Sequence, residues 1–429
     1  MTTNIARISQ IAKERPKEIF TSVYHMIDME LLKECYDELD VNKAKGIDGI
    51  TKKEYGDKLK ENLKGIVERL KNKSYRPNPA RRVRIPKANG KTRGLAIANF
   101  EDKIVQLAIT KIIGAIFEPK LANNMFGFRA NRSCHDCLRY LKRCIEKEKT
   151  NYILDADIRG YFDNINHERL IKCLEMHLKD KNLIRLVKRF IKAGIIENGE
   201  YTKGEIGTPQ GSILSPILAN IYMHYVLIKW FDIEIKAKAR GYIEIVNYAD
   251  DCAICFQWKE EAKEVYEKIK RRLKQCKLEY SEEKTRLIEF GRYAKHKGKK
   301  KAETFDFLGF TIYCSTSRYG RFRVKLKTAN KKFKQKVQEY KDWIKRNRNK
   351  ALHEIMETTI RKIIGHYNYY GVTDNIKELY KFRKQVIKLI MKWLNRRSQK
   401  KSYNQEGFKQ MIERYKIPIP RIKVKILAI

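Results

Sequence analysis

The sequence predicts an α+β protein with a strand-containing central part and a helical C-terminal part. Short runs rich in β-branched and aromatic residues, such as residues 243–247 and 252–256, alternate with stretches that have helical spacing of apolar residues. Beyond about residue 324 the pattern becomes helical and strongly basic. With 429 residues, of which 42% are hydrophobic, the chain can bury a core in each of two or three domains.

The N-terminal region is predicted to be helical up to about residue 75. Leu31, Leu32, Tyr36 and Leu39 are spaced for one buried helix face, and residues 45–50 interrupt the pattern as a turn.

Residues 81–95 predict a basic β-hairpin whose turn is Asn89-Gly90. The hairpin could simply be solvated, but its six basic residues favour a role in holding phosphate.

The central region is predicted to alternate helices, strands and loops. First come a helix over 102–118, which Pro119 ends, and a strand over 152–154 that leads into acidic residues 155–163. A helix with Leu170, Cys173, Leu174 and Leu178 on one side follows, and then a Gly/Pro loop over 207–212 that opens an apolar helix over 213–230. The last elements are an acidic hairpin, a helix over 260–276 and an apolar turn over 306–310.

Charge limits the classes of partner. Lys and Arg number 94 against 51 Asp and Glu, giving a net charge of +43. Such an excess calls for a polyanion, and nucleic acid is the first candidate because basic side chains release counterions from phosphates. A membrane surface is the alternative, although no apolar run approaches the ~20 residues that span a bilayer.

The C-terminal quarter concentrates this charge, with 29 Lys and Arg against 8 Asp and Glu in residues 325–429. Aromatic residues are interleaved with the cations, as in folded RNA-binding surfaces. We expect most of the rings to form the core of this region and most of the charges to contact RNA.

Two cysteine pairs, Cys134/Cys137 and Cys252/Cys255, raise the question of zinc. The first pair falls in a helix-like stretch (133–148) with no second pair near it. The second lies on a strand, where residues three apart point to opposite faces. The N-terminus lacks a secretory apolar core, so we expect an intracellular protein whose nine cysteines are mostly buried free thiols.

The acidic hairpin carries Tyr248-Ala249-Asp250-Asp251 between two apolar strands. Adjacent acids at such a tip are unfavourable unless a cation is held there, and Mg²⁺ prefers carboxylate oxygens. A solvated Asp-rich turn is the alternative.

Asp157, at the end of an apolar strand, offers a second source of carboxylate. Two divalent metal ions ~3.5–4 Å apart can activate an attacking hydroxyl and stabilise a leaving pyrophosphate. The order of basic hairpin, Asp157, Gly/Pro loop and acidic hairpin therefore suits phosphoryl transfer to a nucleotide.

This series of motifs resembles the fingers and palm of reverse transcriptases, most closely those encoded by bacterial group II introns. The matching residues are 82–87 with 91–93, 126–129, 157–163, 207–211, 248–251, Lys284 and 307–310. Residues 365–371 and 393–398 resemble the thumb, or maturase domain, of the same family. The resemblance implies a right-hand polymerase fold with an antiparallel palm sheet, divided into an N-terminal extension and start of the fingers (1–75), fingers and palm (76–320) and a helical thumb/maturase domain (325–429).

The resemblance also assigns roles to residues. Asp157, Asp250 and Asp251 would hold two Mg²⁺ ions, with Mn²⁺ as a substitute and with Ile158 beside them in the metal site. Phe162 would be the steric gate against ribose, and Lys284 the acid for pyrophosphate. The incoming nucleotide would be held by Lys87, Arg93, Ile158, Arg159, Phe162 and Gln210, and the primer grip would comprise Phe307, Leu308 and Gly309.

The function implied is an RNA-directed DNA polymerase that copies intron RNA and helps it splice and move. Its partners would be group II intron RNA, a DNA primer or target strand and dNTPs, with no membrane, in the bacterial cytoplasm and at the nucleoid during mobility. The oligomeric state, a dimer included, stays open. Many relatives continue into a Cys-rich HNH endonuclease, which is missing here, so we expect priming from another source such as nascent strands at replication forks.

Two other functions stay open. One is a related polymerase that has left its intron and serves phage defence or DNA repair. The other is an RNA-binding splicing factor with a vestigial polymerase site, against which the acids and Phe162 argue.

Overall fold

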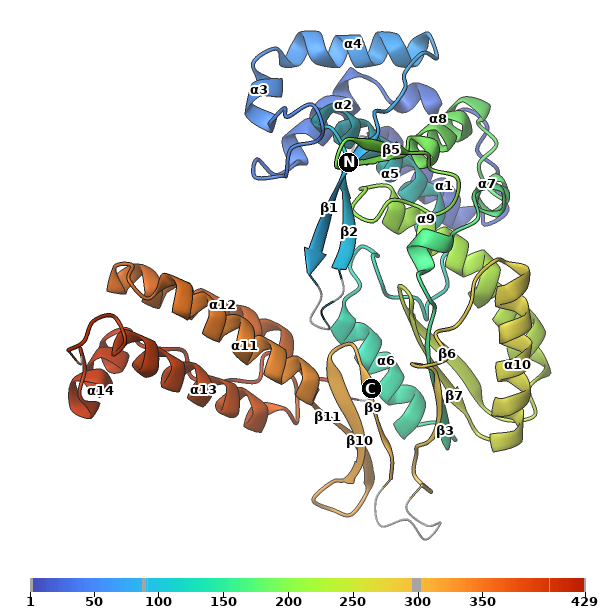
Figure 1. Ribbon diagram of the computed structural model, residues 1–429. Helices are drawn as coiled ribbons and strands as arrows, with labels where there is room; N and C mark the ends of the chain where they lie inside the picture. Colours follow the sequence, from blue (N-terminus) through green and yellow to red (C-terminus); the bar gives the residue numbers. More distant parts are fainter. Residues whose placement is uncertain (1–2, 87–89, 91, 295–301, 401, 428–429) are drawn as a thin grey trace.

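The computed structural model describes residues 3–86, 90, 92–294, 302–400 and 402–427. Figure 1 shows the N-terminal helices, in blue, at one end of the molecule and the strands of residues 152–256 towards the other end. The C-terminal helices, orange to red, project sideways from the strand-containing part.

Helices dominate the first 75 residues, as the apolar spacing predicts. They are α1 (Thr3–Glu14), η1 (Tyr24–Met26), α2 (Met29–Glu38), α3 (Lys52–Gly56) and α4 (Leu59–Lys71). Asp28 caps α2 by accepting the backbone N–H of Leu31, and Thr51 forms a capping box with Glu54 at α3. The expected face of α2 is confirmed, because Leu31, Leu32 and Leu39 are buried.

A four-stranded sheet in the order β2-β1-β4-β5 lies beside these helices. Its strands are β1 (Ala80–Pro86), β2 (Thr92–Ile97), β4 (Ile195–Glu197) and β5 (Glu200–Thr202). The predicted basic hairpin is confirmed as the antiparallel pair β1–β2, whose turn residues Lys87, Ala88, Asn89 and Lys91 lie outside the described residues.

The hairpin β4–β5 was not predicted from the sequence, although it carries a signal. Its two-residue loop is Asn198-Gly199, and both residues have positive φ (51° and 91°). That φ pattern is typical of the tight hairpin turn that Asn-Gly favours.

The central sheet has the order β6-β7-β3-β8, and all its pairs are antiparallel. Its strands are β3 (Tyr152–Asp157), β6 (Ile243–Tyr248), β7 (Asp251–Phe256) and β8 (Arg286–Glu289). The predicted strands on either side of the acidic tetrapeptide are β6 and β7, which are buried along almost their whole length.

This sheet lies between two hydrophobic cores. Cys252, Ile254 and Phe256 of β7 belong to the core that also contains the N-terminal helices, whereas Ala253 and Cys255 belong to the core of the C-terminal helices. The period-two alternation of strand side chains produces this division. The two cysteines therefore point to opposite faces, as predicted.

The helices and short helical segments of residues 100–275 lie partly against the central sheet and partly among the N-terminal helices (Figure 1). They are α5 (Phe100–Phe117), η2 (Glu118–Lys120), α6 (Cys134–Glu146), η3 (Tyr161–Asn164), α7 (His167–Glu175), α8 (Lys181–Lys192), α9 (Ser215–Met223), η4 (His224–Ile228), η5 (Phe231–Ile235), η6 (Lys236–Lys238) and α10 (Lys259–Gln275).

Two predictions for these helices were wrong in detail. The helix expected over 213–230 begins at Ser215, with Pro216 in its first turn, and continues after Met223 as π-helix, which apolar spacing does not distinguish from α-helix. Leu178, expected on the same helix as Leu170, lies beyond the end of α7 and forms a β-bridge with Phe20.

The C-terminal part begins with a three-stranded sheet in the order β11-β10-β9. Its elements are β9 (Thr304–Phe307), β10 (Phe310–Thr316), β11 (Phe322–Thr328), α11 (Asn330–Asn347), α12 (Leu352–Tyr370), α13 (Ile376–Leu394) and α14 (Gln405–Arg414). Most of the aromatic rings that the sequence assigned to the core are buried there, Tyr340, Tyr367 and Trp393 among them.

None of the helices in the described ranges is long and apolar enough to cross a membrane.

Asp180 joins the N-terminal segment to the centre of the molecule. One carboxylate oxygen accepts the backbone N–H groups of Val23 and Tyr24 (both 2.7 Å), and the other caps α8 through Asn182 and Leu183. We expect Asp180→Ala to lower the free energy of unfolding by ~2–4 kcal/mol, because four buried or partly buried backbone donors lose a charged acceptor. Urea unfolding measures this loss, with Asp57→Ala at the exposed end of α3 as control. A loss no larger than that of the control would contradict the prediction.

Candidate active site

The hairpin between β6 and β7 places two carboxylates at its tip. Tyr248 pairs with Asp251, so Ala249 and Asp250 form a two-residue loop. Ala249 has φ = 57°, and it is the member of the pair in the left-handed region. This is the φ pattern of a type II′ turn, which fits the twist of antiparallel strands.

Asn247 holds the tip in this conformation. Its side chain is fully buried, and its amide nitrogen donates to the carbonyl of Ala249 at 2.8 Å and lies 3.1 Å from the sulfur of Cys252. Its backbone pairs with Asn124 and Phe126, which places residues 124–127 alongside β6. The tip is therefore supported from within the hairpin and from the neighbouring segment.

Gly127 lies directly against the tip. A Cβ atom at this position would come within 2.4 Å of the backbone nitrogen of Ala249, so only glycine allows the approach. The carbonyl of Gly127 accepts a hydrogen bond from the buried amide of Asn220 at 2.8 Å.

Asp157 ends β3 and is opposite Asp251 in the register of the β3–β7 pair. The ammonium of Lys284 donates to one oxygen of Asp157 at 2.7 Å. The backbone N–H of Ser281 donates to the carbonyl of Asp157 at 2.8 Å, which fixes the loop before Lys284 to the end of β3. Strand pairing thus brings together Asp157, Asp251 and Lys284, which the sequence had singled out separately.

The carboxyl groups carry negative charge that is only partly compensated. Burial, followed by the charges of Asp250, Asp157 and Asp155, raises the pKa of Asp251 to about 7. Burial also raises the pKa of Asp250, which the charges of Lys284 and Arg93 oppose. The hydrogen bond to Asp157 raises the pKa of Lys284, so the Lys284 ammonium stays protonated at neutral pH.

The donor set fits a hard divalent cation such as Mg²⁺, which would relieve this repulsion. Asp157, Asp250 and Asp251 would hold it. In the ranges that the structure covers, no three His, Cys, Asp or Glu side chains already lie in an arrangement for a metal ion. One oxygen of Asp157 is occupied by Lys284 instead, so the ammonium compensates part of the charge that a cation would neutralise.

Ile158 and Arg159 continue the chain beyond Asp157. Ile158 is buried, and its backbone N–H points to the carbonyl of Asp250 at 3.5 Å. Arg159 is exposed, and its backbone N–H donates to the carbonyl of Glu279 at 2.8 Å. The geometry thus places Ile158 beside the acidic tip and Arg159 at the surface.

Phe162 lies in η3, one turn beyond the acids. Gly160 begins this turn with φ = 55°, and the hydroxyl of the buried Tyr161 donates to the carbonyl of Ala219 at 2.6 Å. The carbonyl of Phe162 accepts the N–H of Thr208 at 2.7 Å. Its ring is partly buried, so the backbone of Phe162 is fixed while one part of its ring remains accessible.

The loop 207–211 lies between η3 and the basic hairpin. The side-chain amide of Gln210 donates to the carboxylate of Asp163 at 3.2 Å. The backbone carbonyl of Gln210 accepts the N–H of Ala96 in β2 at 2.6 Å. Cβ atoms at Gly207 and Gly211 would collide with the carbonyls of Asp163 and Ala96. Gln210 is therefore brought close to Phe162, whereas Lys87 lies outside the described residues.

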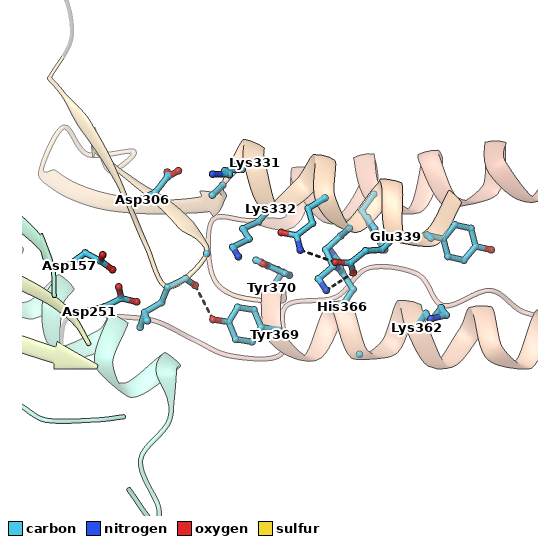
Figure 2. A pocket seen from close by; sticks show the side chains of 18 of the residues that line it. Asp157, Asp251, Asp306, Lys331, Lys332, Glu339, Lys362, His366, Tyr369 and Tyr370 are labelled. Carbon is cyan, nitrogen blue, oxygen red and sulfur yellow. Dashed lines mark hydrogen bonds and ion pairs between the residues drawn. The ribbon is translucent and has the colours of Figure 1, made fainter. Parts of the chain in front are cut away.

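The turn between β9 and β10 consists of Leu308 and Gly309, with φ values of 47° and 78°. A positive φ is costly for leucine. Tyr369 stabilises the turn by donating its hydroxyl to the carbonyl of Leu308 at 2.9 Å, as Figure 2 shows. Phe310 stacks on the Tyr369 ring with centroids 5.8 Å apart. Phe307 is buried, whereas Leu308 and Gly309 are partly buried and form the accessible part of the predicted grip.

A cleft of about 950 Å³ connects this turn to the acids. Asp157, Asp251 and Lys284 line one end of it, and α11 and α12 line the other end. Figure 2 shows Lys331, Lys332 and Lys362 along the helical part. The cleft thus has Asp157 and Asp251 at one end and mostly basic side chains along its walls, with Asp306 and Glu339 among them. This distribution suits the phosphate backbone of a nucleic acid that leads to a metal site.

Several residues of the site were missed from the sequence. Asn247 could have been found, because it is a polar residue inside an otherwise apolar strand run. Asp163 and Tyr369 lie in motifs that the sequence singled out, but their contacts with Gln210 and Leu308 could not be predicted, because they join residues 47 and 61 positions apart.

Comparison with known proteins finds relatives that match the part of the chain containing these residues. Residues 85–312 match the model of the family "Reverse transcriptase (RNA-dependent DNA polymerase)". The group II intron-encoded protein LtrA of Lactococcus lactis subsp. cremoris is 39% identical over 222 residues, which are 51% of this chain and 37% of LtrA. Protein YkfC of Escherichia coli K12 is 28% identical over 309 residues, 65% of this chain and 78% of YkfC. Nuclear intron maturase 4 of Arabidopsis thaliana is 26% identical over 141 residues, 32% of this chain and 17% of that protein. The chain thus matches well under half the length of LtrA.

The raised pKa of Asp251 predicts a pH-dependent loss of stability in the metal-free protein. Because this pKa is about 7 when folded and ~3.9 when unfolded, the folded state binds more protons, and stability falls as pH rises between these values. Asp251→Asn should remove this loss and raise the free energy of unfolding by roughly 1–3 kcal/mol at pH 8, with little gain at pH 4.

Thermal unfolding in a chelator measures both effects. Asp306→Asn, at an exposed acid of the same cleft, controls for the change in net charge. Equal pH dependence in the wild type and in Asp251→Asn would contradict the prediction.

Proposed function

Since the chain belongs to the reverse transcriptase (RNA-dependent DNA polymerase) family, we propose that it copies RNA into DNA at the site formed by Asp157, Asp250 and Asp251. The observation that carries this proposal is the strand register that sets Asp157 opposite Asp251, beside Lys284, at the end of a cation-lined cleft. Adjacent strands hold Asp157 and Asp251, so the spacing of these two carboxylates does not depend on a loop.

Each group has a distinct proposed role. The three carboxylates hold divalent metal ions, which supply activation of the primer hydroxyl and charge neutralisation on the phosphates. Lys284 is protonated at neutral pH. Once its ammonium has left Asp157, Lys284 can give a proton to the departing pyrophosphate. Ile158, the residue directly after β3, lines the metal site.

The incoming nucleotide is proposed to lie between the acids and the basic hairpin. Arg93 on β2 is near enough for its charge to lower the pKa of Asp250, so it can reach a triphosphate bound to the acids. Lys87 and Arg159 complete the cationic set, and Gln210 supports the nucleotide and template. The ring of Phe162 lies under the sugar and rejects a 2′-hydroxyl.

The finer architecture is proposed to be that of a right hand. We assign residues 1–75 to the N-terminal extension and the start of the fingers, 76–320 to the fingers and palm, and 325–429 to the thumb/maturase domain. The antiparallel sheet β6-β7-β3-β8 serves as the palm, and the turn of Phe307, Leu308 and Gly309 serves as the primer grip. The C-terminal helices share their hydrophobic core with one face of the central sheet, and rings such as Tyr340, Tyr367 and Trp393 fill the helical part of that core, which supports a thumb packed against the palm.

Group II intron RNA is the proposed template and splicing partner, with a DNA strand as primer, dNTPs as substrates and two Mg²⁺ ions as cofactors. The names of LtrA and of the plant maturase refer to introns, and the net charge of +21 over residues 325–429 suits RNA. By likeness to the bacterial relatives, the proposed place of action is the cytoplasm, and the nucleoid during mobility.

Primer extension on an RNA template with Mg²⁺ tests the polymerase. We expect Asp250→Ala to reduce cDNA synthesis at least roughly a hundredfold, because a bound metal ion contributes several kcal/mol to catalysis. Binding of group II intron RNA and its splicing should remain close to wild type. Asp57→Ala is the control. Absence of cDNA from the wild type would refute the proposed activity, and loss of RNA binding in Asp250→Ala would show that the acids are structural.

Phe162→Ala tests the gate. Removal of the ring leaves room for a ribose hydroxyl, so the preference for a dNTP over the matching rNTP should fall by roughly tenfold or more. Single-nucleotide incorporation gives kcat/KM for both substrates. Unchanged rejection of the rNTP would remove Phe162 from this role.

A further inference from the structure

Phe128 has a conformation that is unfavourable for its residue type. Its φ is 55°, in the left-handed region that bulky side chains rarely adopt, and its side chain is 54% exposed. Strain and exposure of an apolar ring both oppose folding, and backbone strain tends to persist where it serves a function. The sequence motif of residues 126–129 contains Phe128, and none of the roles proposed above uses this ring.

The neighbours of Phe128 on both sides are fixed. Gly127 is held by Asn220 and by the close approach to Ala249. Arg129 is buried, and its guanidinium donates to the side chain and carbonyl of Glu118 and to the carbonyls of Ala122 and Met125. The backbone of Phe128 is therefore held in its strained conformation by the residues on either side.

The ring of Phe128 contacts the ring of Phe162. Their centroids are 5.9 Å apart and their planes meet at 82°, an edge-to-face arrangement. Phe162 also meets Tyr161 at 5.7 Å and 70°, and Tyr161 is buried and hydrogen-bonded to Ala219. The Phe162 ring thus has two aromatic neighbours, Tyr161 in the core and Phe128 at the surface.

We propose that Phe128 is a positioning residue that fixes the Phe162 ring and so sets discrimination between deoxyribose and ribose. This inference rests on the proposed function, and in particular on the gate role of Phe162. A gate rejects a 2′-hydroxyl only if its ring does not turn aside, and a partly exposed phenylalanine has rotamers to turn into. The Phe128 ring packs against the Phe162 ring and keeps it from turning into those rotamers. Because Gly127 touches Ala249, the same segment relates the gate to the acidic tip.

The test compares variants that separate the ring from the backbone strain. Phe128→Asn removes the ring, while asparagine tolerates positive φ better than other residues with a side chain, and Phe128→Gly removes both ring and strain. Phe128→Tyr keeps the ring. Incorporation of one dNTP and of the matching rNTP, opposite an RNA template with Mg²⁺, gives the ratio of kcat/KM for each variant.

We expect the ratio to fall by roughly tenfold in Phe128→Asn and Phe128→Gly and to stay near wild type in Phe128→Tyr. In a Phe162→Ala background, Phe128→Asn should change the ratio no further, because residues that act through one another are not additive. Tyr319→Ala, at a ring 90% exposed in the turn between β10 and β11, is the control.

Three results would overturn the inference: an unchanged ratio in both ring-deleted variants, an equal fall in Phe128→Tyr, or a full additional fall in the Phe162→Ala background. Unfolding of both ring-deleted variants would also overturn it, because Phe128 would then be needed for the fold. Failure of the proposed function looks different, since the wild type would make no cDNA or Phe162→Ala would leave rNTP rejection unchanged.

Discussion

The repulsion among the carboxyl groups of Asp157, Asp250 and Asp251 is the interaction on which the site depends. Strand pairing forces two of these residues into register, and a two-residue turn places the third beside them. Burial raises the pKa of both hairpin acids because the ionised carboxylates lose hydration, and the charges of the neighbouring acids raise it further. Much of the surrounding structure holds this unfavourable arrangement in place, from the buried amide of Asn247 to the ion pair of Lys284 with Asp157. A bound divalent cation would relieve this repulsion.

Glycines and positive-φ residues determine how closely the other segments approach this centre. Gly127 touches the hairpin tip, Gly207 touches Asp163 and Gly211 touches Ala96, in each case where a Cβ atom would collide with the backbone. Leu308 and Phe128 have positive φ although their side chains disfavour it. Each lies in a segment that other parts of the chain fix. Tyr369 holds the turn of Leu308, and Asn220 and Glu118 hold the residues on either side of Phe128. Strain is thus found where the nucleotide and primer are proposed to bind.

Much of this could be predicted from the sequence, because the signals were local. The apolar strands around Asp250, the basic hairpin and the apolar helix faces all depend on neighbours a few residues apart. The reverse transcriptase family was identified from ordered motifs, and the match over residues 85–312 confirms it. The extension of β1 by β4, the Phe20–Leu178 bridge and the pairing of Tyr369 with Leu308 depend on segments far apart in the chain. The π-helical continuation after Met223 was missed because apolar spacing does not reveal hydrogen-bond periodicity.

The position of the central sheet between two cores gives the molecule a built-in chemical reporter. Cys35, Cys173, Cys252 and Cys276 lie in the core of the N-terminal helices, whereas Cys137, Cys144 and Cys255 lie in the core of the C-terminal helices. A thiol reagent reaches such side chains only when the surrounding structure opens. The order in which these cysteines become modified would therefore show which side of the central sheet loosens first. Cys252 and Cys255, three residues apart on one strand, would report on opposite sides.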